Sequence, residues 1–427
     1  MTPQSHTVTL PHKRPETELL LGCARTRMEP DTTERVRQLL KERIDWNYLT
    51  QTAFHHGVLP LLSWNLHNLC SDDIPKTTLT QLKATFRAIA QWNLYVTGEL
   101  LKLLNLFQDA GIRALPFKGP ALAAATYGNL SLRHFGDLDV LMLREDILKA
   151  KDILVSQGYS PKSRFTPSEE AAYLRSHHDY KFVRDNDGVV VEIQWGITQW
   201  SFAFPIEFDD VWKRREEVSL AGVAALNLSP EDLLLILCVH GTKHRWEQLR
   251  WICDISELIG AQRRKIDWQR LMQQARVQGG ERMVLLGLFL AHNLLGAVLP
   301  EQASKRIHND LHVKCLAGQV GRSLFREASQ PAGLLDESPF FYWQVRERLQ
   351  DKLALLWRYF PDYFLRMIIP NEKDREFWLL PSWLSAGYYL IRPVRLIREH
   401  WLDSLWRPLG ARKPNHTIRE ESTPPTR

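Results

Sequence analysis

The run DLDVLML at residues 137–143 constrains the fold more than any other feature of this chain. Acidic and apolar residues alternate along it, which is the pattern of a β-strand with one buried face. Asp137 and Asp139 therefore share one face, while Leu138, Val140 and Met142 point the other way, into a core. Two carboxylates on one face repel each other unless a positive charge lies between them. A divalent cation is the obvious candidate, since hard cations prefer oxygen ligands.

A third acid is predicted to join this pair. In the run VVVEIQW at residues 189–195, Glu192 shares a strand face with Val190 and Gln194. If this strand neighbours the first, the three acids can hold two divalent ions, Mg²⁺ or Mn²⁺. Such a pair of ions activates an attacking hydroxyl and stabilises a leaving pyrophosphate. The competing interpretation is that these acids are solvated residues on strand edges.

Upstream of the acids, the run FKGPAL at residues 117–122 predicts a corner from a strand into a helix. Gly119 allows close backbone approach, and Pro120 suits the first turn of a helix. The start of that helix favours phosphate, to which Lys118 can add a point charge. Arg133 is a further phosphate candidate, or it pairs with an acid for structural reasons.

Periodicity predicts an α+β protein with a small mixed-sheet core flanked by N-terminal and C-terminal helical regions. We expect a long amphipathic helix from about residue 79 to 109, and short strands near 112–117, 137–143, 180–185 and 188–197. The predicted organisation is a disordered arm (1–30), an N-terminal helical region (31–110), the mixed α/β core (111–215), a helical domain (226–330), a Trp- and Arg-rich helical region (335–410) and a disordered tail (411–427).

Composition indicates a cytoplasmic protein. The five cysteines form no CxxC pair, which argues against a zinc site or a disulfide framework and fits a reducing compartment. The N-terminus has no apolar core of the signal-peptide kind, and no apolar run is long enough to span a membrane. The net charge of +6 permits an anionic partner without requiring one.

The run KGPALAAATYGNLSLRHFGDLDVL at residues 118–141 resembles the signature of an uncharacterised bacterial nucleotidyltransferase family in the DNA polymerase beta-like superfamily. The resemblance implies a nucleotidyltransferase core, an NTP donor, and Asp137, Asp139 and Glu192 as metal ligands and catalytic residues. It also implies that Lys118 and Gly119 contact the nucleotide. Pro120 departs from the Gly-Gly or Gly-Ser corner of the superfamily, because proline has neither an N–H nor a hydroxyl to offer a phosphate.

The run HGTKHRWEQLRWICDI at residues 240–255 is typical of the same family. His240, Lys243 and His244 share one helix face by their spacing, and form a basic surface that can cover a base and its phosphates. A similarity to nucleotidyltransferase toxins of the abortive-infection type implies that Lys243 and Asp254 contact the nucleotide. The alternative is a polar network between helices. HGTKH lacks the glutamate of HExxH, which excludes a metalloprotease of that type.

Together these features predict a metal-dependent transfer of a nucleoside monophosphate from an NTP to a hydroxyl or phosphate acceptor. None of these motifs specifies the acceptor: a small molecule, a tRNA and a protein all remain open, and no stable membrane insertion is expected. Two other functions stay open. One is a catalytically silent nucleotide sensor, and the other is a basic RNA-binding or membrane-surface protein that uses residues 335–410.

Overall fold

The computed structural model describes residues 14–69, 73–163, 165–197, 204, 207–326 and 340–355. The chain divides into two units, Met1–Leu356 and Trp357–Arg427, and every element described below belongs to the first. The predicted tail at 411–427 and most of the predicted region at 335–410 lie outside the described residues.

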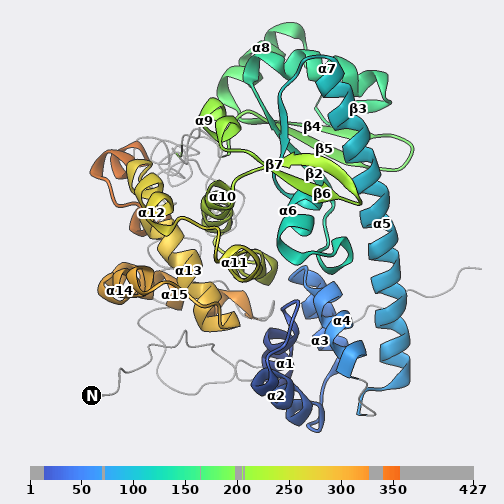
Figure 1. The fold of residues 1–427 in the computed structure, drawn as a ribbon, viewed down its shortest axis with the longest axis vertical. Coiled ribbons are helices and arrows are strands. Elements are labelled where there is room, and N and C mark those ends of the chain that lie inside the picture. The colour runs from blue at the N-terminus through green and yellow to red at the C-terminus, as the bar shows by residue number, and fades with distance from the viewer. Residues whose placement is uncertain are drawn as a thin grey trace, which may run out of the picture. The chain divides into compact units, whose positions relative to one another are not determined.

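The N-terminal part is helical, as the sequence indicates. It comprises α1 (Pro15–Cys23), α2 (Pro30–Leu40), α3 (Trp46–His55), α4 (Leu59–Leu69) and the long helix α5 (Lys76–Asp109). α5 packs on α4 near its start and beside the sheet near its end, so it links the two regions (Figure 1). The sequence favours a loose arm over residues 1–30, whereas α1 forms there because Leu19, Leu20 and Cys23 are fully buried.

A mixed sheet follows the N-terminal helices along the chain. Among the described residues, β1 (Ala114–Pro116), β2 (Asp137–Met142), β3 (Tyr159–Pro161), β4 (Asp179–Arg184) and β5 (Val190–Gln194) form one sheet in the order β1-β2-β5-β4-β3. β2 and β5 pair in parallel, and the other neighbours are antiparallel. The connections carry α6 (Gly119–Leu122) with a π-helical turn (Ala123–Tyr127), α7 (Ile147–Ser156) and α8 (Pro167–Ser176).

The two faces of this sheet have different partners. Leu138, Val140 and Met142 are fully buried in one apolar cluster with Leu103 and Phe107 of α5, as the alternation along β2 predicts. The opposite face carries the acids, and beyond them Leu115, Phe117 and Leu141 belong to the larger core that includes α10 and α11. Burying each such side chain stabilises the fold by about 1.5–3 kcal/mol, so the acid-bearing face is rigidly backed.

The rest of the described chain is a helical array after a hairpin. α9 (Phe208–Lys213) precedes the hairpin of β6 (Glu216–Leu220) and β7 (Val223–Asn227). The helices then run α10 (Pro230–Lys243), α11 (Leu249–Gln262), α12 (Trp268–Val277), α13 (Glu281–Leu295), α14 (Glu301–Asn309), α15 (Leu311–Leu324) and α16 (Phe340–Val345). α10 begins at Pro230, where the Ser229 hydroxyl accepts a hydrogen bond from the Asp232 N–H and caps the helix.

These elements confirm the predicted α+β class with a small mixed sheet flanked by helices. Local details differ. α2 begins at Pro30, one residue before the expected N-terminal helical region at 31–110. The hairpin of β6 and β7 is absent from the expected elements, because β7 shows no alternation between apolar and polar residues.

Candidate active site

The three predicted acids meet on one face of the sheet. Asp139 of β2 lies directly opposite Glu192 of β5 in the parallel register, and Asp137 precedes Asp139 by one full pleat on the same face. Each residue offers a carboxylate oxygen, and these oxygens all lie within 4.8 Å of one another. Asp139 and Glu192 are buried, and Asp137 is half-buried. The adjacency of β2 and β5 thus creates one acidic cluster from residues that are far apart in sequence.

Two lysines partly neutralise this cluster. Lys118 Nζ lies 3.1 Å from Asp139 Oδ1, and Lys181 Nζ lies 2.7 Å from Glu192 Oε2. Lys181 lies opposite Glu192 in the antiparallel register of β4 and β5, so strand pairing places it there. The side-chain amide of Gln194 adds two hydrogen bonds, from Nε2 to Asp139 Oδ1 at 2.7 Å and to Glu192 Oε1 at 2.8 Å.

The electrostatic environment still disfavours negative charge at the two buried acids. Burial raises the pKa of the Asp139 carboxyl, Asp137 raises it further, and Lys118 opposes both effects. Burial also raises the pKa of Glu192, and the neighbouring charge of Asp139 adds to that rise. Acids that resist ionisation until a cation is near are typical of sites that bind divalent metals or perform proton transfer.

The corner after β1 places Lys118 against Asp139. Gly119 adopts a left-handed backbone with φ of +52°, which glycine accepts without strain. A Cβ atom at Gly119 would lie 3.1 Å from the Asp137 carbonyl oxygen, so the corner packs directly on the start of β2. Pro120 follows in the first turn of α6, as the sequence suggests.

The end of α10 carries the residues of the predicted basic surface, and the start of α11 adds Trp251. The rings of His240 and His244 lie 4.7 Å apart, and Trp251 packs on both, at 5.6 and 5.2 Å respectively. Burial and nearby Lys118 lower the pKa of His240 well below its usual range. Burial and Lys243 lower the pKa of His244 to about 4. Both imidazoles are therefore neutral at pH 7.

Lys243 lies in the last turn of α10, half-buried. Burial and the neighbouring charge of Lys118 lower its pKa, while Asp179 and Glu192 act in the opposite direction. Lys243 therefore lies within electrostatic reach of both Lys118 and the acidic cluster. A cation held near another cation at a partly buried site favours an anionic ligand.

A tight turn holds this segment. Arg245 and Trp246 both adopt left-handed backbone conformations, with φ of 54° and 59°. They turn the chain so that the fully buried Trp246 ring packs back on Gly241, where a Cβ atom would lie within 2.6 Å of three ring atoms. The glycine and tryptophan of the HGTKHRW run are therefore explained by packing.

Arg133 and Asp254 bind each other. Arg133 donates from Nε to Asp254 Oδ1 at 2.7 Å and from Nη2 to Oδ2 at 2.9 Å, and the Tyr127 hydroxyl donates to the same Oδ1 at 2.7 Å. Both charged side chains are buried. This network ties the segment before β2 to α11, which orients the start of the acid-bearing strand.

Arg250 was not predicted from the sequence as a candidate site residue. It precedes Asp254 by one helical turn on α11, so the two share a helix face. Its stem lies against Gly57, where a Cβ atom would come within 2.6 Å of Arg250 Cδ, and its backbone N–H donates to the His56 carbonyl. The buried Nε of Arg250 has no hydrogen-bond partner among the described residues, and Asp137 is among the charges that act on it.

Gln194 and Lys181 were also not identified as site residues, although Gln194 was expected on the face of Glu192. The available signal was strand alternation. Once β4, β5 and β2 are aligned, Lys181, Glu192 and Asp139 form one row across the sheet, with Gln194 in the next row. That alignment depends on pairing between distant segments, which one sequence does not specify.

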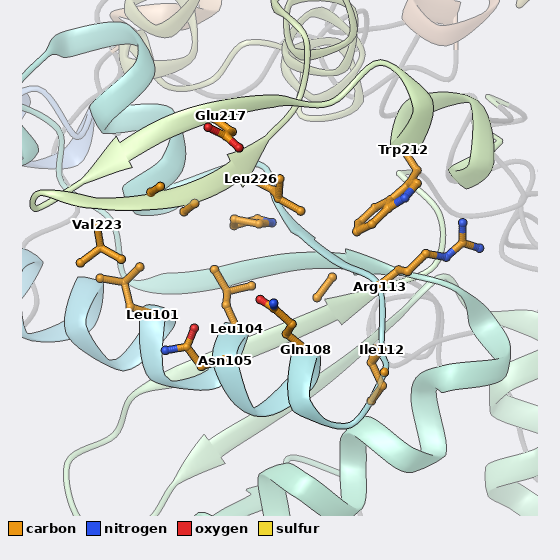
Figure 2. Close-up of a pocket in the computed structure, with 15 residues that line it drawn as sticks. Leu101, Leu104, Asn105, Gln108, Ile112, Arg113, Trp212, Glu217, Val223 and Leu226 are labelled. Carbon is orange, nitrogen blue, oxygen red and sulfur yellow. The ribbon is translucent and has the colours of Figure 1, made fainter.

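A large cavity lies elsewhere. It has a volume of about 470 Å³ and is bounded by α5, β1, α9 and β7, with Leu104, Trp212 and Leu226 among its walls (Figure 2). Arg113 and Glu217 are its charged lining residues, and none of the three clustered acids contributes to it. The chemistry of the acids therefore belongs to the opposite face of the sheet.

In the described part of the chain, no helix has the length and apolarity needed to cross a membrane. The model of a family described as uncharacterised nucleotidyltransferase matches residues 42–296, which is more than half of the chain and includes every element that contributes to the acidic cluster. A comparison with curated proteins gives no match.

Proposed function

Because the chain belongs to this family of uncharacterised nucleotidyltransferases, we propose that it transfers a nucleoside monophosphate from an NTP to a hydroxyl or phosphate acceptor, with Asp137, Asp139 and Glu192 as metal ligands. The observation that carries the proposal is the convergence of three carboxylates within 4.8 Å on adjacent parallel strands. The donor set consists only of carboxylate oxygens, which fits a hard divalent cation such as Mg²⁺ or Mn²⁺.

When bound, such ions lower the barrier by polarising the phosphoryl group and activating the attacking oxygen. The chain's own residues supply the rest. Burial and the charge of Asp139 raise the pKa of Glu192, so we assign it as the group that takes the proton from the acceptor. Asp137 and Asp139 hold the reacting groups in register from one rigid strand.

We assign the triphosphate to the cationic side of the cluster. Lys118 at the Gly119 corner would contact it, with Lys243 and Arg250 as further cations. We assign the base to the side of the His240, His244 and Trp251 rings, which pack on one another. Because Arg133 and Asp254 satisfy each other, we assign them a supporting role behind this surface.

Labelled-donor transfer tests the proposal. The protein, with each α-³²P-labelled NTP and Mg²⁺ or Mn²⁺, is mixed with cell extract, and labelled products are resolved. We expect transfer by the wild type and none by Asp137→Ala/Asp139→Ala. Glu145→Ala/Asp146→Ala is a matched control, because these adjacent acids lie in the short helical turn just after β2 and are expected to be dispensable.

Thermal melting with the same ligands separates the outcomes. A ligand at a hundredfold its Kd stabilises the folded state by about 2.7 kcal/mol. Metal-dependent stabilisation by an NTP without transfer would replace the proposal with a nucleotide sensor. If a folded wild type shows no stabilisation by any NTP and no transfer, the proposal is refuted. The third hypothesis is binding of RNA or a membrane surface through residues 335–410. Most of that segment lies outside the described residues.

A further inference from the structure

Gln194 is a neutral amide placed between two acids. It is the last residue of β5, its side chain is buried with 3% exposure, and it lies one pleat beyond Glu192 on the same face. Its Nε2 donates to Asp139 Oδ1 at 2.7 Å and to Glu192 Oε1 at 2.8 Å. One amide nitrogen therefore joins carboxylates on two neighbouring strands.

This bridge uses the full donor capacity of the group. A side-chain amide nitrogen has two N–H bonds, and both are directed at carboxylate oxygens here. Hydrogen bonds to charged acceptors are about twice as strong as neutral ones, so the bridge opposes the repulsion between Asp139 and Glu192. It does so without adding a positive charge that would compete with a cation.

The bridge also determines which carboxylate oxygens are occupied by hydrogen-bond donors. Asp139 Oδ1 accepts from both Gln194 and Lys118, and Glu192 accepts from Gln194 at Oε1 and from Lys181 at Oε2. Asp139 Oδ2 has no donor within the ranges that the structure describes, and this leaves it free to bind a cation. The carboxylates are thus held in a fixed orientation before any ligand is present.

We propose that Gln194 is a positioning residue for the metal site: it fixes the separation and orientation of Asp139 and Glu192 so that their remaining lone pairs converge with Asp137 on a divalent cation. This inference rests on the proposed function. Residues that hold metal ligands by hydrogen bonds typically change metal affinity by about 10–100-fold when they are replaced. A glutamine that merely filled space would leave that affinity unchanged.

Mn²⁺ binding by the full-length protein tests this directly, since electron paramagnetic resonance measures both free Mn²⁺ and the spectrum of the bound ion. Gln194→Met keeps the length of the side chain and removes its donors. We expect the Kd for Mn²⁺ to rise by about 10–100-fold, with a changed spectrum for the bound ion. Gln262→Met is the control, because Gln262 is a half-buried glutamine whose side chain donates to the Ala125 carbonyl, at 3.1 Å, and not to an acid of the cluster.

A second variant covers the case in which Gln194→Met does not fold. Gln194→Asn keeps the amide but shortens the side chain by one methylene, so the amide nitrogen no longer reaches both acids, and a smaller loss of the same sign is expected. Folded variants with the wild-type affinity and spectrum would overturn the inference and leave the proposed function intact. A wild type without saturable Mn²⁺ binding would overturn both.

Discussion

The pair formed by Arg133 and Asp254 gives the sharpest stability prediction. Arg133→Met removes the guanidinium and leaves the Asp254 carboxylate with the Tyr127 hydroxyl as its remaining hydrogen-bond donor. The Asp254 side chain is 0% exposed and that of Arg133 is 8% exposed, so water cannot replace the lost partner. The variant therefore buries the Asp254 carboxylate without its ion-pair partner.

The expected loss follows from that burial. Breaking a buried ion pair by removing one partner destabilises a protein by about 3–5 kcal/mol. That is a large part of a total stability of about 5–15 kcal/mol. The double variant Arg133→Met/Asp254→Leu replaces both charges with apolar groups, and we expect it to recover most of the loss. The coupling between the two sites should exceed about 2 kcal/mol.

Urea unfolding in EDTA measures these differences as changes in the midpoint at constant slope. Arg250→Met is the matched control, because Arg250 lies one turn away on α11 and its Nε lacks a partner among the described residues. It should change stability by less than about 1 kcal/mol. If Arg133→Met is equally mild while NTP affinity falls at least tenfold, the structural role is refuted and Arg133 contacts the nucleotide.

Three further outcomes are expected. Burial raises the pKa of Asp139 and Glu192, so the folded state keeps their protons to higher pH than the unfolded state does. The stability of the metal-free protein should therefore fall as pH rises from about 4 through the folded-state pKa values, by about 1.4 kcal/mol for each pH unit that separates the folded and unfolded pKa of a group. Urea melts of Asp139→Asn at several pH values should show a flatter profile. Gly241→Ala forces a Cβ atom into the Trp246 ring and should destabilise by about 1–3 kcal/mol in thermal melts, whereas Gly260→Ala, with open space around it, should be neutral or stabilising. Arg250→Met should weaken NTP binding at least tenfold in calorimetry with an unchanged Mn²⁺ affinity; wild-type NTP affinity would exclude Arg250 from the phosphate site.

The strand character of residues 137–142 and the faces of its side chains could be predicted from the sequence, because alternation along one strand is a local property. The proximity of Glu192 followed from a second alternating strand and needed only one correct pairing. The partners of Arg133 could not be predicted in this way. Asp254 lies 121 residues away on α11, and no local pattern selects it over another acid.

The same limit applies to the surroundings of the acids. Gln194 and Lys181 follow from a register that only the assembled sheet specifies. Arg250 is placed by Gly57, a left-handed glycine in the corner between α3 and α4, whose φ is +68°. The contact between Gly57 and Arg250 depends on the tertiary packing of the N-terminal helices against α11, which no local sequence pattern specifies.

Lys118 lies beside both Asp139 and the proposed triphosphate site, so its replacement should change the affinities for Mn²⁺ and for NTP in opposite directions. It forms an ion pair with Asp139 at 3.1 Å, and it also follows β1 at the corner where we assign the triphosphate. A cation that binds the acids must compete with this ammonium group for Asp139, because like charges repel at such short range. Lys118→Met should therefore tighten Mn²⁺ binding in the absence of nucleotide and weaken NTP binding.

Calorimetric titration of each ligand alone measures the two signs, and Lys149→Met on α7 is the control, since that lysine binds the Ala110 carbonyl away from the acids. A fall in both affinities would mean that Lys118 supports the acids instead of competing for them. Opposite signs would show that the chain supplies its own counter-charge while the cation is absent. The lysine released from Asp139 would then be available to the phosphates, which makes binding of the cation and of the nucleotide mutually favourable.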